Sequence, residues 1–162
     1  MKKLTVLLLL LVLFVLTATV SANPGQKKLF KAHLAGAFEV PAVATVSTGQ
    51  AIFHLSADGS SLHYKLIVAN LEDTLQAHIH LAPIGTNGSV VAFLYPEAPP
   101  PILIPGGFSG VLAEGDITAA DLRGPLAGLT IQDLVAEMVA GNTYVNVHTV
   151  ENPGGEIRGQ IR

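Results

Sequence analysis

The segment QAIFHLSADGSSLHYKLIV, residues 50–68, decides the fold class of this chain. Apolar and polar residues alternate on both sides of Asp58-Gly59, as they do along strands with one buried face. Asp-Gly between two such runs is a strong signal for a β-hairpin, because glycine accepts the positive φ of a tight turn. With Asp58-Gly59 as the loop, the apolar faces of the two strands coincide. The expected cross-strand pairs are Leu55 with Leu62, Phe53 with Tyr64, and His54 with His63.

Short strands and turns continue along the chain on either side of this hairpin. Residues 96–105 contain five prolines, which excludes a central strand and predicts a surface loop. Two short helices are expected to begin at Thr118 and Thr130, because each is an N-cap residue followed three positions later by an acid. The pattern predicts an all-β fold, a Greek-key β-sandwich or flattened barrel of seven to eight strands, with the two short helices in one connection. The other strands are expected at residues 29–35, 75–81, 90–95, 108–113, 144–149 and 156–161.

The first 22 residues have the three parts of a secretory signal peptide. The positive start Met1-Lys2-Lys3 precedes an apolar run, which ends in the cleavage-type site Val20-Ser21-Ala22. The alternative, a membrane anchor, needs about 20 apolar residues, and this run is shorter. We therefore expect a signal peptide at residues 1–22, a loose lead-in at 23–27, and one domain at 28–162. The domain would be exported to the periplasm, the cell wall or the medium.

Composition narrows the class of function. Residues 23–162 hold seven basic and twelve acidic residues, a net charge of −5, which argues against a nucleic-acid partner because such partners need clustered Lys and Arg. The chain has no cysteine, so it has no disulfide and no thiolate metal site. No second apolar run is long enough to span a membrane after cleavage. A serine hydrolase is disfavoured because the Gly-x-Ser-x-Gly elbow is absent.

Histidines are the residues with the clearest potential for chemistry. In AHIHL, residues 77–81, the period of two places His78 and His80 on one strand face, about 7 Å apart, where they can converge on one ion. A purely structural role for this pair stays open. Three further histidines lie on strands with mixed neighbours and are interpreted as surface or structural residues: His33, His54 and His63.

The last hairpin brings a sixth histidine to a polar strand face. A five-residue loop at residues 151–155 keeps the apolar faces of its two strands together. This register places His148 beside Arg158, away from the apolar face. The expected pairs are Val145 with Ile161, Val147 with Gly159, and His148 with Arg158.

The exported part of the chain resembles the CHRD domain, the module named after chordin. The resemblance covers roughly residues 28–162. It implies a secreted domain of a kind widespread in microbes and usually without an assigned activity. In chordin, repeated copies belong to a protein that binds growth factors of the bone-morphogenetic class, and nothing in a single copy points to such a partner. The matching stretches are FEVP at 38–41, LSADG at 55–59, AHIH at 77–80, GPLAG at 124–128, and 144–161 with its NVHT and NPGGEIRG runs.

A second, weaker resemblance is to copper–zinc superoxide dismutase, a Greek-key β-barrel. His78 and His80 would match its His-x-His pair, and His148 would match a later strand ligand. Arg158 would match the residue that guides the anionic substrate. The chain departs from that enzyme because it lacks cysteine, a histidine-rich zinc loop after His80, and a bridging histidine. A three-histidine copper or zinc site is still compatible with the ligand types.

Two functional hypotheses follow. The first is a secreted, non-enzymatic binding module with a possible histidine metal site, whose partner is an unknown extracellular protein or small ligand. The second is a copper or zinc metalloprotein with dismutase-like chemistry. Asn87-Gly88-Ser89 is a glycosylation acceptor pattern or a plain Asn-Gly turn. The candidate metal ligands are His78, His80 and His148, and the candidate contacts for an anion or ligand beside them are Arg158 and Glu156.

Overall fold

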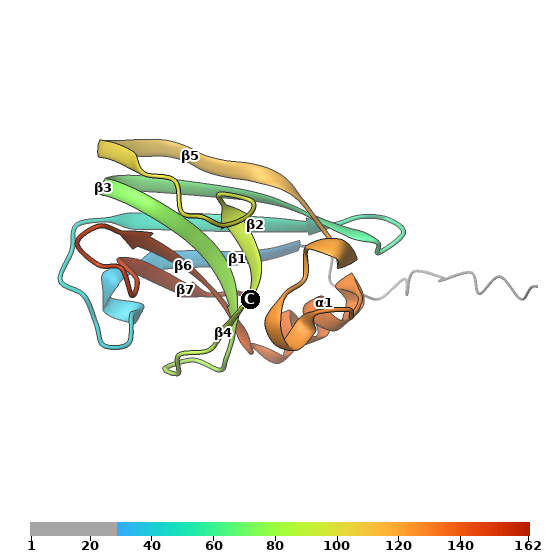
Figure 1. Cartoon of the computed structure of the whole chain (residues 1–162). Coiled ribbons are helices and arrows are strands. Elements are labelled where there is room, and N and C mark those ends of the chain that lie inside the picture. Colours follow the sequence, from blue (N-terminus) through green and yellow to red (C-terminus); the bar gives the residue numbers. More distant parts are fainter. Residues whose placement is uncertain (1–28) are drawn as a thin grey trace, which may run out of the picture.

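The computed structural model describes residues 29–162, in which seven strands form an antiparallel sheet that curls into a flattened barrel (Figure 1). The all-β class is therefore confirmed, whereas the expected signal peptide and lead-in lie outside the described residues. No helix in the described part is long and apolar enough to cross a membrane. The strands are β1 (Leu29–Ala35), β2 (Thr48–Leu55), β3 (Ser61–Leu81), β4 (Ser89–Tyr95), β5 (Ile104–Thr118), β6 (Thr143–Thr149) and β7 (Ile157–Gln160).

The hairpin formed by β2 and β3 has the expected register. The Asp58 carboxylate accepts hydrogen bonds from Ser56 Oγ (2.6 Å) and from the Ser60 N–H (3.1 Å). Gly59 has a φ of 75°, which glycine adopts without strain. The turn therefore forms through the residues that the sequence singled out. Leu55 lies opposite Leu62, Phe53 opposite Tyr64, and His54 opposite His63.

β3 is longer than expected, because the strands predicted at 62–68 and 75–81 are one continuous strand. The strand bends at Asn70 and Asp73, which have positive φ values of 59° and 45° and coincide with irregularities in its pairing to β5. β5 follows the bend through two hydrogen bonds, one of 2.9 Å from the Asn70 N–H and one of 2.7 Å to the Asp73 carboxylate. β5 itself covers residues 104–118 rather than the predicted 108–113, so it begins inside the proline-rich segment.

β3 belongs to both layers of the barrel. Its first half pairs with β2 and β5, and its second half pairs with β4 and β6. On the opposite side β1 meets β7, where Ala35 lies opposite Arg158. The order β2-β1-β7-β6-β3 therefore returns to β2, while β4 and β5 extend from β3. The apolar core lies inside this closed ladder.

One α-helix, α1 (Ile131–Ala140), lies at one end of the barrel (Figure 1). Its N-cap Thr130 and Asp133 form the expected capping box, and Gly141 ends it in the left-handed conformation with a φ of 75°. The capping box at Thr118 also forms, but the helix predicted to begin there is only a 3-10 turn of three residues. The 3-10 turns are Gly36–Phe38, Ala119–Asp121 and Gly124–Leu126. The buried face of α1 comprises Ile131, Leu134, Val135 and Met138.

The final hairpin differs from its expected register by two residues. Asn146, not His148, lies opposite Arg158. The loop is longer than five residues because it is built around the buried Glu156 carboxylate, which accepts a hydrogen bond from Thr149 Oγ1 (3.0 Å). A shift of two residues leaves every side chain on its own face. His148 and Arg158 therefore still share the polar face, but they are not cross-strand neighbours.

Candidate metal centre

The polar face of β6 is buried, although it points away from the barrel core. All seven residues of β6 are buried. Loops cover this face and form hydrogen bonds with its side chains. Glu39 accepts a hydrogen bond from the Asn146 amide, and the carbonyls of Gly88 and Pro153 contact the rings of His80 and His148. The face that lies between β6 and these loops forms a second, polar interior beside the apolar core.

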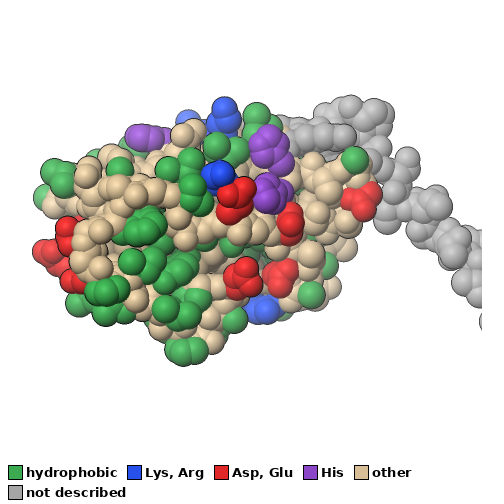
Figure 2. Space-filling model, turned by 90° about the horizontal axis from the view of Figure 1, so that it is seen from above, with side chains coloured by type: hydrophobic (Ala, Val, Ile, Leu, Met, Phe, Trp, Pro, Cys, Tyr) green, Lys and Arg blue, Asp and Glu red, His purple; other side chains and the backbone are tan. Residues whose placement is uncertain are grey.

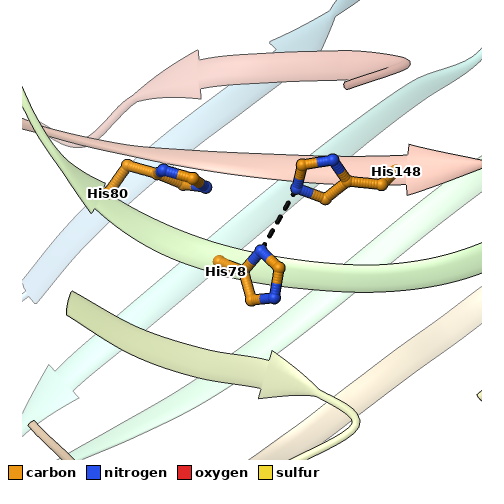
Figure 3. Close-up of side chains that lie close together, drawn as sticks. All are labelled: His78, His80 and His148. Atoms are coloured by element: carbon orange, nitrogen blue, oxygen red, sulfur yellow. Dashed lines mark hydrogen bonds between the residues drawn. The ribbon is translucent and has the colours of Figure 1, made fainter. Parts of the chain in front are cut away.

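Three histidines meet in this polar interior (Figure 3). His78 and His80 extend from β3 and His148 extends from β6, with 4%, 9% and 6% of each residue exposed. His78 Nδ1 lies 3.1 Å from His148 Nε2. One ring nitrogen from each residue lies within 4.8 Å of the others. The structure therefore brings together the three candidate ligands that the sequence singled out.

Backbone carbonyls determine which ring nitrogens face the centre. Nδ1 of His80 lies 3.0 Å from Gly88 O, and Nδ1 of His148 lies 2.9 Å from Pro153 O. A carbonyl only accepts, so each Nδ1 carries the proton and each Nε2 presents a lone pair. Metal-binding histidines usually have such a partner on their second nitrogen. Zinc–nitrogen bonds of 2.0–2.1 Å place tetrahedral ligands about 3.3 Å apart. The widest separation of up to 4.8 Å between the ring nitrogens would therefore have to shorten by up to about 1.5 Å when an ion binds.

Burial keeps the three imidazoles neutral. Desolvation, together with the neighbouring His148 and His80, lowers the pKa of His78 to about 3. Desolvation also lowers the pKa of His148 to about 4 and lowers the pKa of His80. Neutral imidazole is the form that coordinates metals, so no proton has to leave these rings at neutral pH before an ion binds.

A guanidinium, a phenol ring and an imidazole are stacked beside the three histidines. Arg158 Cζ lies 3.4 Å from the centroid of the Tyr144 ring, and that ring stacks on His80 at 4.8 Å with 8° between the planes. Arg158 is 2% exposed and donates to Asn87 Oδ1 (2.8 Å) and to the Thr86 carbonyl. The predicted ligand contact Arg158 is thus a buried cation that packs against the candidate metal centre through Tyr144.

The polar interior also contains two buried carboxylates, Glu39 and Glu156, whose pKa values are shifted in opposite directions. Burial raises the pKa of Glu39 to about 7, although the Arg158 charge and the hydrogen bond from Asn146 Nδ2 (2.6 Å) oppose the rise. Burial also raises the pKa of Glu156, but hydrogen bonds from four neighbouring hydroxyl and amide side chains outweigh it and hold this pKa below its usual value. Glu156 is 8% exposed, and its hydrogen bonds from Thr149 and Asn152 hold the loop after β6 in place.

The comparison with protein families concerns nearly the whole of the described chain. The family model for the CHRD domain matches residues 30–161. The chain belongs to the CHRD domain family. Chordin from Xenopus laevis is 34% identical to it over 133 residues, which cover 79% of this chain and 12% of chordin. This CHRD domain therefore spans a small fraction of that relative. No solved structure matches it.

Acid is expected to destabilise this CHRD domain between pH 6.5 and pH 5. The folded pKa values of His78 and His148 lie well below the unfolded value of about 6.5, so the unfolded chain binds more protons in this range. Each of the two imidazoles then removes about 2 kcal/mol of folding free energy at pH 5. Glu39, whose folded pKa is raised, acts in the opposite direction. Urea unfolding of a Glu39→Gln variant at pH 8, 6.5 and 5 isolates the histidines, and a level free energy of unfolding would contradict their neutral burial.

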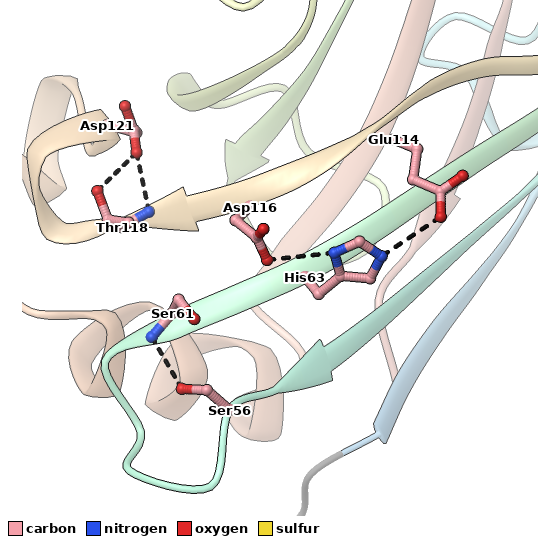
Figure 4. A network of polar contacts seen from close by, with 7 residues as sticks. All are labelled: Ser56, Ser61, His63, Glu114, Asp116, Thr118 and Asp121. Atoms are coloured by element: carbon pink, nitrogen blue, oxygen red, sulfur yellow. Dashed lines mark hydrogen bonds and ion pairs between the residues drawn. The ribbon is translucent and has the colours of Figure 1, made fainter.

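The other three histidines lie on the surface of the CHRD domain, as interpreted from the sequence. His33, His54 and His63 are all exposed. His63 Nδ1 lies 3.1 Å from Asp116 Oδ1, and Nε2 lies 3.4 Å from Glu114 Oε1 (Figure 4). Figure 2 shows histidines and acidic side chains close together on this face. Exposed pairs of this kind contribute about 0–1 kcal/mol.

Several residues of the polar interior were not assigned a role from the sequence. Tyr144 and Asn146 alternate with valines along the strand as His148 does, and that alternation is the signal that could have included them. Glu39 lies in the FEVP stretch that carries the CHRD resemblance, but it is far from the histidines along the chain. Its position against Asn146 follows from how the loop after β1 packs, which local alternation does not encode.

Proposed function

We propose that this CHRD domain is an exported, non-enzymatic binding module that holds one zinc or copper ion on His78, His80 and His148. The observation that carries the proposal is the convergence of three neutral imidazoles in a buried polar interior. Export is supported by the signal-peptide pattern of residues 1–22 and by the CHRD family, whose resemblance implies a secreted domain. The partner of the module is proposed to be an extracellular protein or a small ligand.

One buried ring nitrogen that faces the centre, His80 Nε2, has no hydrogen-bond partner within the described chain, which supports an ion there. His78 Nε2 and His80 Nε2 are buried and make no hydrogen bond there. An unsatisfied buried polar atom costs about 1–3 kcal/mol. For His80 the orphaned atom is the one that presents a lone pair to the centre. His78 Nδ1 donates to His148 Nε2, and a shift of that proton to His78 Nε2 would turn both facing nitrogens into donors of lone pairs to an ion.

Dismutase-like chemistry at the same residues is less well supported. The chain matches the CHRD family, and the departures from the dismutase pattern concern the residues that would complete its metal sites. Loops leave 4–9% of each histidine exposed. Three histidines leave the fourth position of a tetrahedral ion without a protein ligand, as in catalytic sites, but the burial of all three rings restricts access to that position. We therefore propose that the ion orders the loops over the polar interior rather than reacting with a diffusing substrate.

Metal titration of the untagged protein tests the proposal. We expect one zinc ion per chain and tighter binding of copper(II), in line with the general affinity order of divalent metals. Zinc at about 100 times its Kd should add about 2.7 kcal/mol to the free energy of unfolding, which raises Tm by about 10 °C in a domain of this size. Elemental analysis and calorimetry measure the two effects. A protein without metal, whose Tm zinc does not change, would overturn the metal part of the proposal.

A further inference from the structure

The positive charges of the described chain gather in one place. Residues 29–162 contain five Lys or Arg residues and twelve Asp or Glu residues. Three of these five cations, Lys31, Arg158 and Arg162, line one groove, together with a single acidic side chain, Glu39. The groove is thus cationic on a domain whose overall charge is negative. The positive potential in the groove attracts anions, even though the net charge of the domain is negative.

The groove lies where β1 and β7 meet, on the face that points away from the apolar core. It has a volume of about 740 Å³. Lys31 and Arg162 are held opposite one another by a reciprocal pair of backbone hydrogen bonds of 2.8 and 2.9 Å. This pairing places both side chains on the same face of the ladder. The two exposed cations therefore form a fixed pair at the groove.

The rest of the groove is largely apolar. Phe38, from the 3-10 turn after β1, is 52% exposed, and Ile84, from the loop after β3, is 69% exposed. Both line the groove, and Arg158 lines it from a buried position against Tyr144. Small-molecule sites are typically concave spaces of about 300–1,000 Å³ with mostly apolar walls and a few convergent polar groups. This groove has that size and that mixture.

We propose that this groove binds an amphipathic small-molecule anion, a carboxylate or sulfonate on an apolar body. Lys31 and Arg162 pair with the anionic group, and Phe38 and Ile84 pack against the apolar body. Charge complementarity selects the anion, because three of the groove's four charged side chains are cationic. The site is separate from the proposed metal centre, and it supplies the small-ligand class that the binding-module function leaves open, so it rests on that function.

Two fluorescent probes with nearly the same apolar body test this site. Anilinonaphthalene sulfonate carries one negative charge, and phenylnaphthylamine carries none. We expect the sulfonate to bind saturably and at least about tenfold more tightly than the neutral amine, and decanoate to displace it where decanol does not; a tenfold difference corresponds to about 1.4 kcal/mol. Equal affinity for the two probes would overturn the proposal.

Matched charge variants locate the binding. Lys31→Gln/Arg162→Gln should weaken the sulfonate about tenfold and leave the neutral probe unchanged. The control Lys65→Gln/Arg123→Gln removes the two cations of residues 29–162 that lie outside the groove, and it should bind the sulfonate as the unchanged protein does. Unchanged sulfonate affinity in the first variant, or an equal loss in both, would place binding elsewhere.

The His78→Ala/His80→Ala variant separates this proposal from the metal site. We expect it to bind the sulfonate normally, because no histidine of the candidate metal centre lines the groove. Far-ultraviolet circular dichroism confirms that each variant is folded. Loss of zinc with retained sulfonate binding in this variant would support two separate sites. Zinc binding by the unchanged protein without selective sulfonate binding would overturn the groove and leave the metal proposal standing.

Discussion

Replacing His78 and His80 together with alanine is expected to abolish stoichiometric metal binding. The pair supplies two of the three converging imidazoles, and the remaining His148 does not hold an ion against water and buffer by itself. The zinc content should fall from one ion per chain to below about a tenth of an ion, and added zinc should no longer raise Tm. Elemental analysis and calorimetry of parallel preparations measure both quantities.

The chain offers a matched control for this experiment. His54 and His63 also form a pair, but they lie opposite one another on the exposed face of β2 and β3. The variant His54→Ala/His63→Ala removes the same number of imidazoles and should retain one zinc ion per chain. A full equivalent of zinc in the His78→Ala/His80→Ala protein would show that the ligands lie elsewhere. Equal losses in the two double variants would indicate nonspecific surface binding.

Arg158→Met is expected to lower the free energy of unfolding by about 3–5 kcal/mol at pH 8. The substitution removes two charge-assisted hydrogen bonds and the cation that stacks on Tyr144. It also leaves the buried Glu39 without the positive charge that lowers its pKa. Methionine keeps most of the length of the side chain, so the loss reports charge and hydrogen bonding more than packing. Urea unfolding curves measure the difference.

The loss at Arg158 should be smaller at pH 6 than at pH 8. Glu39 has a folded pKa of about 7, above its ordinary value of 4.5, so acid neutralises it in the folded state and removes the unpaired charge. Adding Glu39→Gln to Arg158→Met should therefore recover part of the stability at pH 8. The control is Arg123→Met, an exposed arginine bonded to backbone carbonyls, which should cost about 1 kcal/mol or less. Equal losses at the two arginines would contradict a special role for the buried one.

Local alternation was enough to predict the parts of the fold that short-range geometry determines. The hairpin around Asp58-Gly59 forms with the expected partners, and His78 and His80 share a face because successive strand residues point to opposite sides. The same argument kept His148 and Arg158 on one face even though the register of their hairpin was wrong by two residues. The alternation of apolar and polar residues is enough to predict which face of a strand a side chain is on. The exact cross-strand pairing depends in addition on the conformation of the loop that joins the two strands.

The rest of the site depends on contacts that join distant parts of the chain. Two residues with positive φ, Asn70 and Asp73, let β3 continue through a segment that its sequence does not mark as a strand, because β5 bonds to it there. The loops that cover the polar face contribute Glu39, Gly88 and Pro153, which approach the histidines only after the barrel has closed. Burial on both faces of β6 is a property of these loops and not of the strand sequence.

The bend in β3 changes which alternate residues face the apolar core. Before the bend the core residues are even-numbered, and after it they are odd-numbered, as Leu66 and Val68 show on one side and Ala77 and Ile79 on the other. The pairing to β5 shifts at the same place, between Val68 and Leu71. A strict period of two carried on from Val68 would turn His78 and His80 into the apolar core. The bend is therefore an offset of one residue that keeps both histidines in the polar interior and Ile79 in the core.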